Sequence, residues 1–249
     1  MPSSEAPSWL SELLRTAPTF TLEPSSHSKP NHPHLRSTIA DLQVHPALEA
    51  GLHLANRDLY SAHFLVRKGQ GGARELDWGH ALLHRLEGDW GNGKCWYTDL
   101  DNHAAPGSIY KRFFSSLPKE LTACQFVDLT AFYSIPSEAT PDVIAQQAHK
   151  VFQSSESFGK VKTGFSREQL DRFVADPSSA PLSRAETEEW ARKELAAMVE
   201  GLAEEHGWAP MGMKESVEAL KEQKGGEEGQ AVSHDAQGMV LGGGGGRKY

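Results

Sequence analysis

Apolar side chains recur every three or four positions through the middle of the chain, a spacing typical of amphipathic helices. The pattern predicts helices over 46–56, 59–68, 78–87, 90–100, 141–153 and 184–207. Residues 125–133 fit a helix or a strand, and we favour a helix. Leucine occurs 25 times but valine and isoleucine together only 15 times, which argues against a β-rich protein because strands favour β-branched residues. We therefore predict an all-α fold, a compact multi-helix domain of antiparallel helical hairpins.

Capping residues support these helix boundaries. Pro46 stands at a first helical position, and Asp58, Asp77 and Asp89 can each cap the helix that follows. Gly88 fits the position just past the end of the helix over 78–87. Two further pairs match the capping box: Ser166 with Gln169, and Ser183 with Glu186.

The two ends of the chain have a different composition from the middle. Residues 211–249 hold 10 of the 23 glycines and few large apolar side chains, so they bury too little surface to offset the entropy of ordering them. We expect a mostly disordered N-terminal segment over 1–35, a single α-helical domain over 36–209, and a disordered Gly-rich and charged tail over 210–249. Short helices near 8–15 and 215–220 are the ordered elements that we expect in the two ends.

Composition narrows the class of protein. The net charge of −8 argues against a nucleic-acid partner. No run reaches 18 consecutive apolar residues and no basic segment precedes an apolar one at the start, so we expect neither a transmembrane span nor a signal peptide. We therefore expect a soluble, intracellular and cytoplasmic protein. Two cysteines, Cys95 and Cys124, are too few for a disulfide framework.

The helix predicted over 78–87 carries one residue on the wrong face. On a helical wheel its polar arc holds Asp77, His80, His84 and Glu87, and its apolar arc holds Trp78, Ala81, Leu82 and Leu86. Arg85 falls inside the apolar arc. Because an unpaired buried guanidinium is costly, we expect a carboxylate beside Arg85, and the candidates are Glu49, Asp58 and Asp89.

Five histidines lie between His45 and His84, and two interpretations of them stay open. In the first, the helices bring together a cleft of four of them: His53, His63, His80 and His84. In the second, His80 and His84 belong to a solvated face and His63 is a core histidine with its own partner. The spacing of His80 and His84 also lets both imidazoles reach one divalent metal ion, although the Glu that metalloproteases carry directly after the first His is Ala81 here.

The string HALLHRLEGDWGNGKCWY, residues 80–97, resembles a signature of an uncharacterised family of fungal and bacterial proteins. That signature reads approximately H-A-x-x-H-R-x-E-x-D-x-x-N-A-K-Y-W-Y/F, and this chain departs from it at Gly93 and Cys95. The likeness extends upstream to Pro46, about a fifth of the chain. It implies helices and the polar cluster, but no activity. The same string is similar to the turn of a tetratricopeptide hairpin, although no 34-residue period repeats along the chain.

Two functional hypotheses follow, and the sequence leaves open whether the protein is an enzyme. In the first, a polar pocket binds a small molecule or anion, or carries acid/base or metal-assisted chemistry. There His63 and His84 would transfer protons, Arg85 would hold an anionic group or a carboxylate partner, and Glu87 would assist as an acid or ligand. In the second, the chain is a non-catalytic helical module that binds a protein partner. A pocket requires these side chains to converge on a cavity, whereas a module requires an exposed apolar or charged groove.

Overall fold

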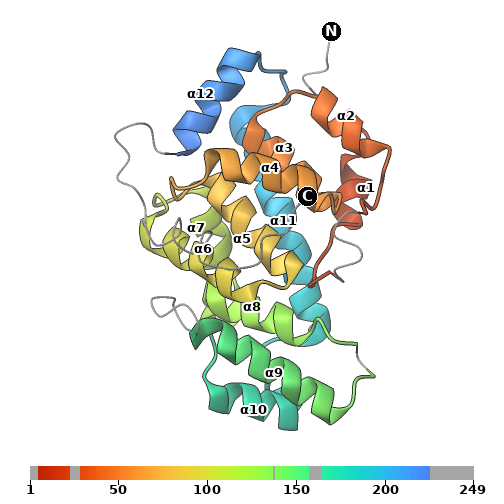
Figure 1. The fold of residues 1–249 in the computed structure, drawn as a ribbon, viewed down its shortest axis with the longest axis vertical. Helices are drawn as coiled ribbons and strands as arrows, with labels where there is room; N and C mark the ends of the chain where they lie inside the picture. The colour runs from red at the N-terminus through yellow and green to blue at the C-terminus, as the bar shows by residue number, and fades with distance from the viewer. Residues whose placement is uncertain (1–4, 23–28, 137, 157–163, 225–249) are drawn as a thin grey trace, which may run out of the picture.

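The computed structural model describes residues 5–22, 29–136, 138–156 and 164–224, and within these ranges the secondary structure is helical, with no strand (Figure 1). The first helices are α1 (Leu10–Arg15), α2 (Leu35–Asp41), α3 (Pro46–Ala55), α4 (Leu59–Gly69), α5 (Glu75–Glu87), α6 (Trp90–His103) and α7 (Ile109–Ser115). The later ones are α8 (Ala123–Phe132), α9 (Pro141–Glu156), α10 (Arg167–Ala175), α11 (Arg184–His206) and α12 (Met213–Gln223), with short 3-10 turns at Pro118–Glu120 and Pro177–Ser179. The predicted all-α class is confirmed, and 125–133 lies almost wholly within α8.

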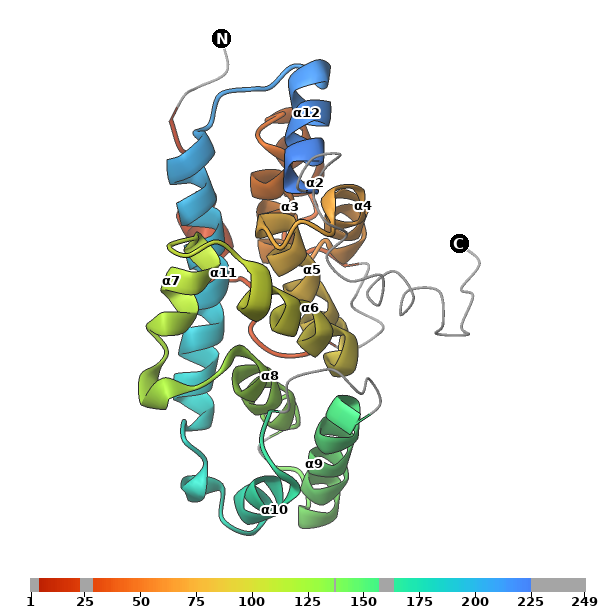
Figure 2. The ribbon, with the colours of Figure 1, turned by 90° about the vertical axis from the view of Figure 1, so that its left-hand side faces the viewer.

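Helices α11 and α5 organise the packing. α11 runs along one side of the molecule and contacts α1, α3, α7 and α8, while the α9–α10 pair lies at one end and α12 at the other (Figures 1 and 2). α5 is enclosed by α3, α4, α6 and α7, so its side chains are buried on every face from Glu75 to Leu86. The interpretation that His80 and His84 lie on a solvated face is therefore wrong, because α6 and α4 cover that arc.

Most of the predicted helix ends are confirmed by local hydrogen bonds. The carboxylates of Asp58 and Asp89 accept bonds from backbone amides in the first turns of α4 and α6, and both capping boxes form. Gly88 ends α5 with a φ of +79°, a left-handed conformation that favours glycine. Asp77 differs, because α5 begins three residues earlier than predicted. Its carboxylate instead accepts the amides of Gly71 (2.7 Å) and Ala73 (2.6 Å) and so fixes the loop before the helix.

Described residues on both sides of the predicted domain over 36–209 also pack on its core. In α1 the side chain of Leu13 is completely buried. In α12 the Gln223 amide accepts the backbone N–H of Leu76 at 3.1 Å and donates to Glu75 at 3.0 Å. A few apolar and amide contacts are enough to dock these short helices on a core that exists already. The remainder of the predicted tail, 225–249, lies outside the described residues.

None of the helices in the described part of the chain is long and apolar enough to cross a bilayer.

Candidate functional site

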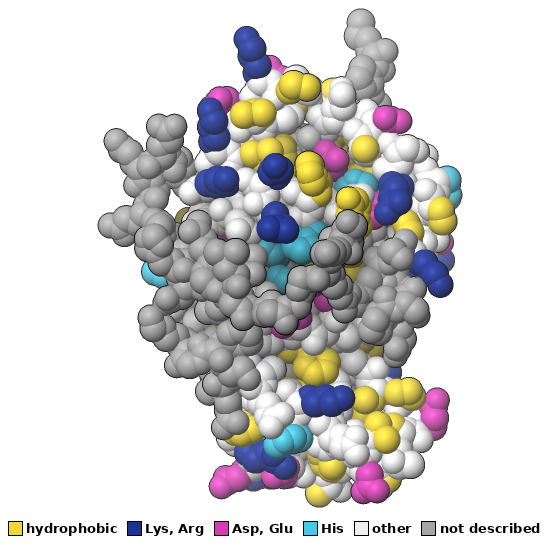
Figure 3. Space-filling model, viewed as in Figure 1, with side chains coloured by type: hydrophobic (Ala, Val, Ile, Leu, Met, Phe, Trp, Pro, Cys, Tyr) yellow, Lys and Arg dark blue, Asp and Glu magenta, His cyan; other side chains and the backbone are white. Residues whose placement is uncertain are grey.

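Three histidines from two helices meet beside one tryptophan. The ring centroids of His80 and His84 on α5 are 4.7 Å apart, and those of His63 on α4 are 5.5 and 6.1 Å from them. Trp96 of α6 stacks on His80 at 4.5 Å. Figure 3 shows histidine side chains gathered in a hollow of the surface, with basic side chains above it and acidic ones below. We call His63, His80 and His84 the histidine cluster.

His84 links the histidine cluster to acidic and amide groups at the end of α5. Its Nδ1 lies 3.2 Å from Glu87 Oε2 and 3.9 Å from Asp89 Oδ2. Its Nε2 lies 3.1 Å from the side-chain amide nitrogen of Asn92. A carboxylate beside one ring nitrogen orients an imidazole and stabilises its protonated form, which is the arrangement that general acid/base catalysis uses. The structure thus brings together three of the predicted residues: His63, His84 and Glu87.

The other two histidines are neutral in their resting state. Burial lowers the pKa of His80 well below its ordinary value, and the neighbouring His84 and His63 lower it further. Burial also lowers the pKa of His63, against the opposing charge of Glu87. His80 is only 1% exposed, and its Nδ1 has no hydrogen-bond partner among the described residues. A buried polar atom without a partner costs free energy, so His80 has unused capacity to bind a ligand or a water molecule.

The outer rim of the hollow belongs to α4 and combines aromatic and basic side chains. Tyr60 and Phe64, one helical turn apart, are 67% and 62% exposed. Arg67 and Lys68 follow on the next turn and line the same hollow as His63. The Lys68 ammonium lies 5.5 Å from the centre of the Phe64 ring. A rim of this kind attracts an anion towards the histidine cluster.

Arg85 lies outside the histidine cluster, and its contacts fit the second of the two roles expected for it, the pairing with a carboxylate. Its side chain is 1% exposed and points away from the histidine cluster, where one nitrogen donates to Glu194 at 2.8 Å and the other to the Thr19 carbonyl at 3.0 Å. Glu194 also accepts bonds from Trp78 Nε1 (3.0 Å) and Tyr97 Oη (2.7 Å). The burial of Arg85 and its need for a carboxylate are confirmed.

The carboxylate that meets Arg85 is none of the three proposed candidates, because Glu194 comes from α11. The apolar stripe of that helix, with Ala191, Leu195 and Met198 all buried, encloses Glu194. A carboxylate within an apolar stripe was the signal that could have identified this partner.

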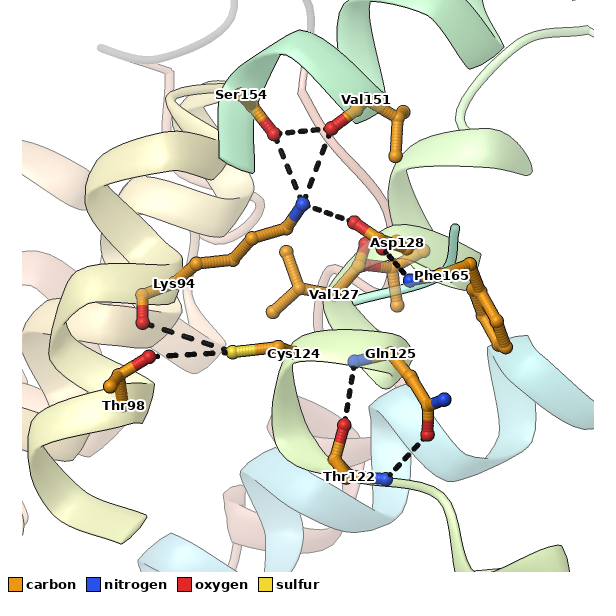
Figure 4. Close-up of polar contacts among 11 residues, drawn as sticks. Lys94, Thr98, Thr122, Cys124, Gln125, Val127, Asp128, Val151, Ser154 and Phe165 are labelled. Carbon is orange, nitrogen blue, oxygen red and sulfur yellow. Dashed lines mark hydrogen bonds and ion pairs between the residues drawn. The ribbon is translucent and has the colours of Figure 1, made fainter. Parts of the chain in front are cut away.

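A second buried ion pair, between Lys94 and Asp128, was missed from the sequence. Figure 4 shows the Lys94 ammonium of α6 against the Asp128 carboxylate of α8, with further bonds to Ser154 Oγ (3.1 Å) and the Val151 carbonyl (3.2 Å) of α9. Asp128 also accepts the backbone N–H of Phe165 at 2.7 Å. This pair joins α6, α8 and α9 in the interior, where both side chains are almost fully buried, so we assign it to the scaffold.

His53 lies outside the histidine cluster. Its Nδ1 is 3.1 Å from Asp58 and its Nε2 is 3.8 Å from Glu49. Burial lowers the pKa of His53, but these two carboxylates outweigh burial and the net shift is upward. Asp58 is also held by two bonds of 2.8 Å from Arg36. The predicted cleft of four histidines therefore contains three.

Among the described residues, no third side chain joins His80 and His84 as a metal ligand. His80 and His84 stack with an angle of 22° between their rings, whereas two imidazoles that share a metal ion point a nitrogen of each at one centre. In the described part of the chain, no group of three or more His, Cys, Asp or Glu side chains is arranged to hold a metal ion. Metal binding at His80 and His84 stays a prediction.

No family model, curated protein or solved structure matches this chain.

Proposed function

We propose that the histidine cluster is a binding site for a small anion, with His63 and His84 as the groups that exchange protons with it. The single observation that carries this proposal is the convergence of three imidazoles beside a basic rim, with a buried His80 Nδ1 that has no hydrogen-bond partner in the described part of the chain. Scaffold histidines are generally satisfied by hydrogen bonds.

Each group has a distinct part in this site. Arg67 and Lys68 attract the anion and neutralise it at the rim. His63, neutral at rest, accepts a proton or a hydrogen bond from it, and the Glu87 carboxylate beside Nδ1 orients the ring of His84. Trp96 stacks on His80 and holds its ring in place. Arg85 takes no part, because Glu194 occupies it.

Thermal unfolding in the presence of inorganic phosphate or acetate tests the proposal. A ligand that binds only the folded protein raises the melting temperature with concentration, so we expect a saturable rise with at least one of the two anions. Arg67→Gln should weaken binding about tenfold. A charge-assisted hydrogen bond contributes roughly 1.5–3 kcal/mol, and the low end applies here because solvent screens the exposed Arg67. Arg172→Gln on α10 is the matched control, since it removes the same charge from an exposed position far along the chain.

Two results would contradict the proposal. The first is a melting temperature that neither anion changes. The second is equal weakening by Arg67→Gln and Arg172→Gln, which would mean that the protein responds to ionic strength and has no site. Binding should also tighten as the pH falls below about 6.5, because the lowered pKa of His63 places its protonation below that value and a protonated imidazole attracts an anion.

One observation favours the second functional hypothesis, a helical module that binds a protein. Tyr60 and Phe64 are the exposed large apolar side chains of α4, and adjacent exposed aromatics often mark protein interfaces. If the chain is only such a module, Tyr60→Ala and Phe64→Ala should leave anion binding unchanged. If the two aromatic rings also contact a bound anion, the same substitutions should weaken its binding.

A further inference from the structure

We propose that the anion bound at the histidine cluster is amphiphilic, with a charged head at Arg67 and Lys68 and an aliphatic chain in a groove between α2 and α4. This inference rests on the proposed function, because it specifies the ligand of the same site. It adds a second binding surface on the other side of α4.

The groove is a defined feature of the described structure. It has a volume of about 540 Å³ and lies over α3, between α2 and α4. Its walls are mainly apolar, and include Pro33, Ala40, Tyr60, Phe64 and Leu65. Pockets that bind small molecules span roughly 300–1,000 Å³ and are lined mostly by apolar side chains. The groove therefore has the size and the surface for an aliphatic chain.

Tyr60 and Phe64 connect the groove to the histidine hollow. Both residues line the groove and both line the hollow that contains His63, so they form a ridge with a binding surface on each side. They are 67% and 62% exposed, although both rings are large and apolar. A ligand that crosses the ridge would cover both rings, which explains why a helix otherwise packed on the core presents them to solvent.

The charges on the two sides of the ridge determine which end of the ligand binds at each. The floor of the groove carries Glu49, whose carboxylate would repel an anionic head, and the His53 beside it is engaged by Glu49 and Asp58. The guanidinium of Arg36 at the groove wall is also occupied, by two bonds to Asp58. The cations on the far side of the ridge, Arg67 and Lys68, line the histidine hollow. An anionic head therefore gains more at that side, and the apolar chain is left for the groove.

Straight-chain carboxylates of increasing length test this proposal on the full chain. The probes are acetate, butanoate, hexanoate and octanoate at one pH and ionic strength, below the concentrations at which they form micelles, with binding measured by calorimetry. Each methylene group that becomes fully buried should tighten binding roughly fourfold. We expect affinity to rise along the series and acetate to bind weakly, since it reaches the histidine hollow alone.

A substitution in α2 separates the groove from the head site. Ala40 lines the groove and is exposed, so Ala40→Phe can fill the groove without disturbing the core. We expect Ala40→Phe to abolish the gain from acetate to octanoate while acetate binds as before. Ala40→Ser is the matched control and should keep the chain-length dependence. Tyr60→Ala with Phe64→Ala should reduce octanoate binding more than acetate binding.

The outcomes distinguish this inference from the function on which it rests. If acetate binds but octanoate binds no more tightly, the amphiphilic ligand is refuted and the small-anion site stands. If Ala40→Phe keeps the full gain, the chain does not lie in the groove, and the inference is likewise refuted. If octanoate binds equally well to Arg67→Gln and neither acetate nor phosphate binds at all, the head is not at the histidine cluster and both proposals fail.

Discussion

Replacement of Arg85 by methionine should be among the most damaging single changes in this protein. The guanidinium is 1% exposed and bridges Glu194 of α11 and the Thr19 carbonyl of the N-terminal segment. Arg85→Met leaves a fully buried carboxylate with two neutral donors, Trp78 and Tyr97, and no cation. Loss of one partner of a buried pair costs about 3–5 kcal/mol, against a domain stability of roughly 5–15 kcal/mol.

A double variant isolates the charge from the packing. In Arg85→Met with Glu194→Gln the buried charge is gone, and the Gln carbonyl can still accept the bonds from Trp78 and Tyr97. We expect this double variant to recover at least half of the stability lost by Arg85→Met, although it removes more polar contacts. Arg192→Met is the control on the same helix α11, because the exposed ion pair of Arg192 with Glu188 should contribute less than about 1 kcal/mol.

Urea unfolding followed by circular dichroism measures these differences, provided that the dependence on urea concentration has the same slope in every variant. If Arg85→Met loses less than about 1 kcal/mol, or if the double variant loses the sum of its two single changes, the buried pair is not coupled as the geometry requires. Arg85→Lys should also be destabilised, because one ammonium cannot reach both Glu194 and the Thr19 carbonyl in the guanidinium geometry.

Three further predictions concern the scaffold. Gly164→Ala should destabilise the protein by about 1–3 kcal/mol, since a Cβ there would overlap the carboxylate of Asp128; an unchanged urea midpoint would contradict this. Burial, together with the neighbouring His206, lowers the pKa of His45 to about 4. Between about pH 6.5 and pH 4 the unfolded chain therefore binds a proton at His45 that the folded protein does not bind. The protein should lose about 2 kcal/mol of stability as the pH falls through this range, after allowance for residual solvation. His45→Asn should flatten the dependence of the urea midpoint on pH in that range, and an unchanged slope would refute the assignment. Removal of residues 225–249 should leave the melting temperature nearly unchanged because of their glycine-rich composition, and a fall of several degrees would show that this segment docks on the domain.

The histidine cluster could be anticipated in part from helical spacing. His80 and His84 share a face of α5 whatever surrounds that helix, and the position of His63 on the apolar side of α4 indicated that it meets a neighbouring helix. Helical spacing could not show that His53 lies outside the histidine cluster. It depends on the turn after α3, which places Asp58 3.1 Å from the ring.

The Arg85 pair shows where prediction from the sequence stops. Helical periodicity identified Arg85 as a buried cation that needs a carboxylate, and it could not choose among carboxylates. The three candidates were near in sequence, whereas Glu194 is 109 residues away. Lys94 gave no signal at all, because α6 is rich in glycine and polar residues and has no clean apolar stripe on which a lysine would look misplaced.

The sequence by itself determined the helices and their ends, because caps, capping boxes and the glycine after α5 act within about four residues of the chain. Tertiary structure alone decided which partner each buried polar side chain meets, and that the polar side of α5 is buried as well. α5 is polar on one side and is nevertheless buried all round, since α4 and α6 pack over its histidines while α11 brings Glu194 to its arginine. That choice depends on the packing of helices distant in the chain, and the free energy of pairing buried charges is gained only once those helices are in place.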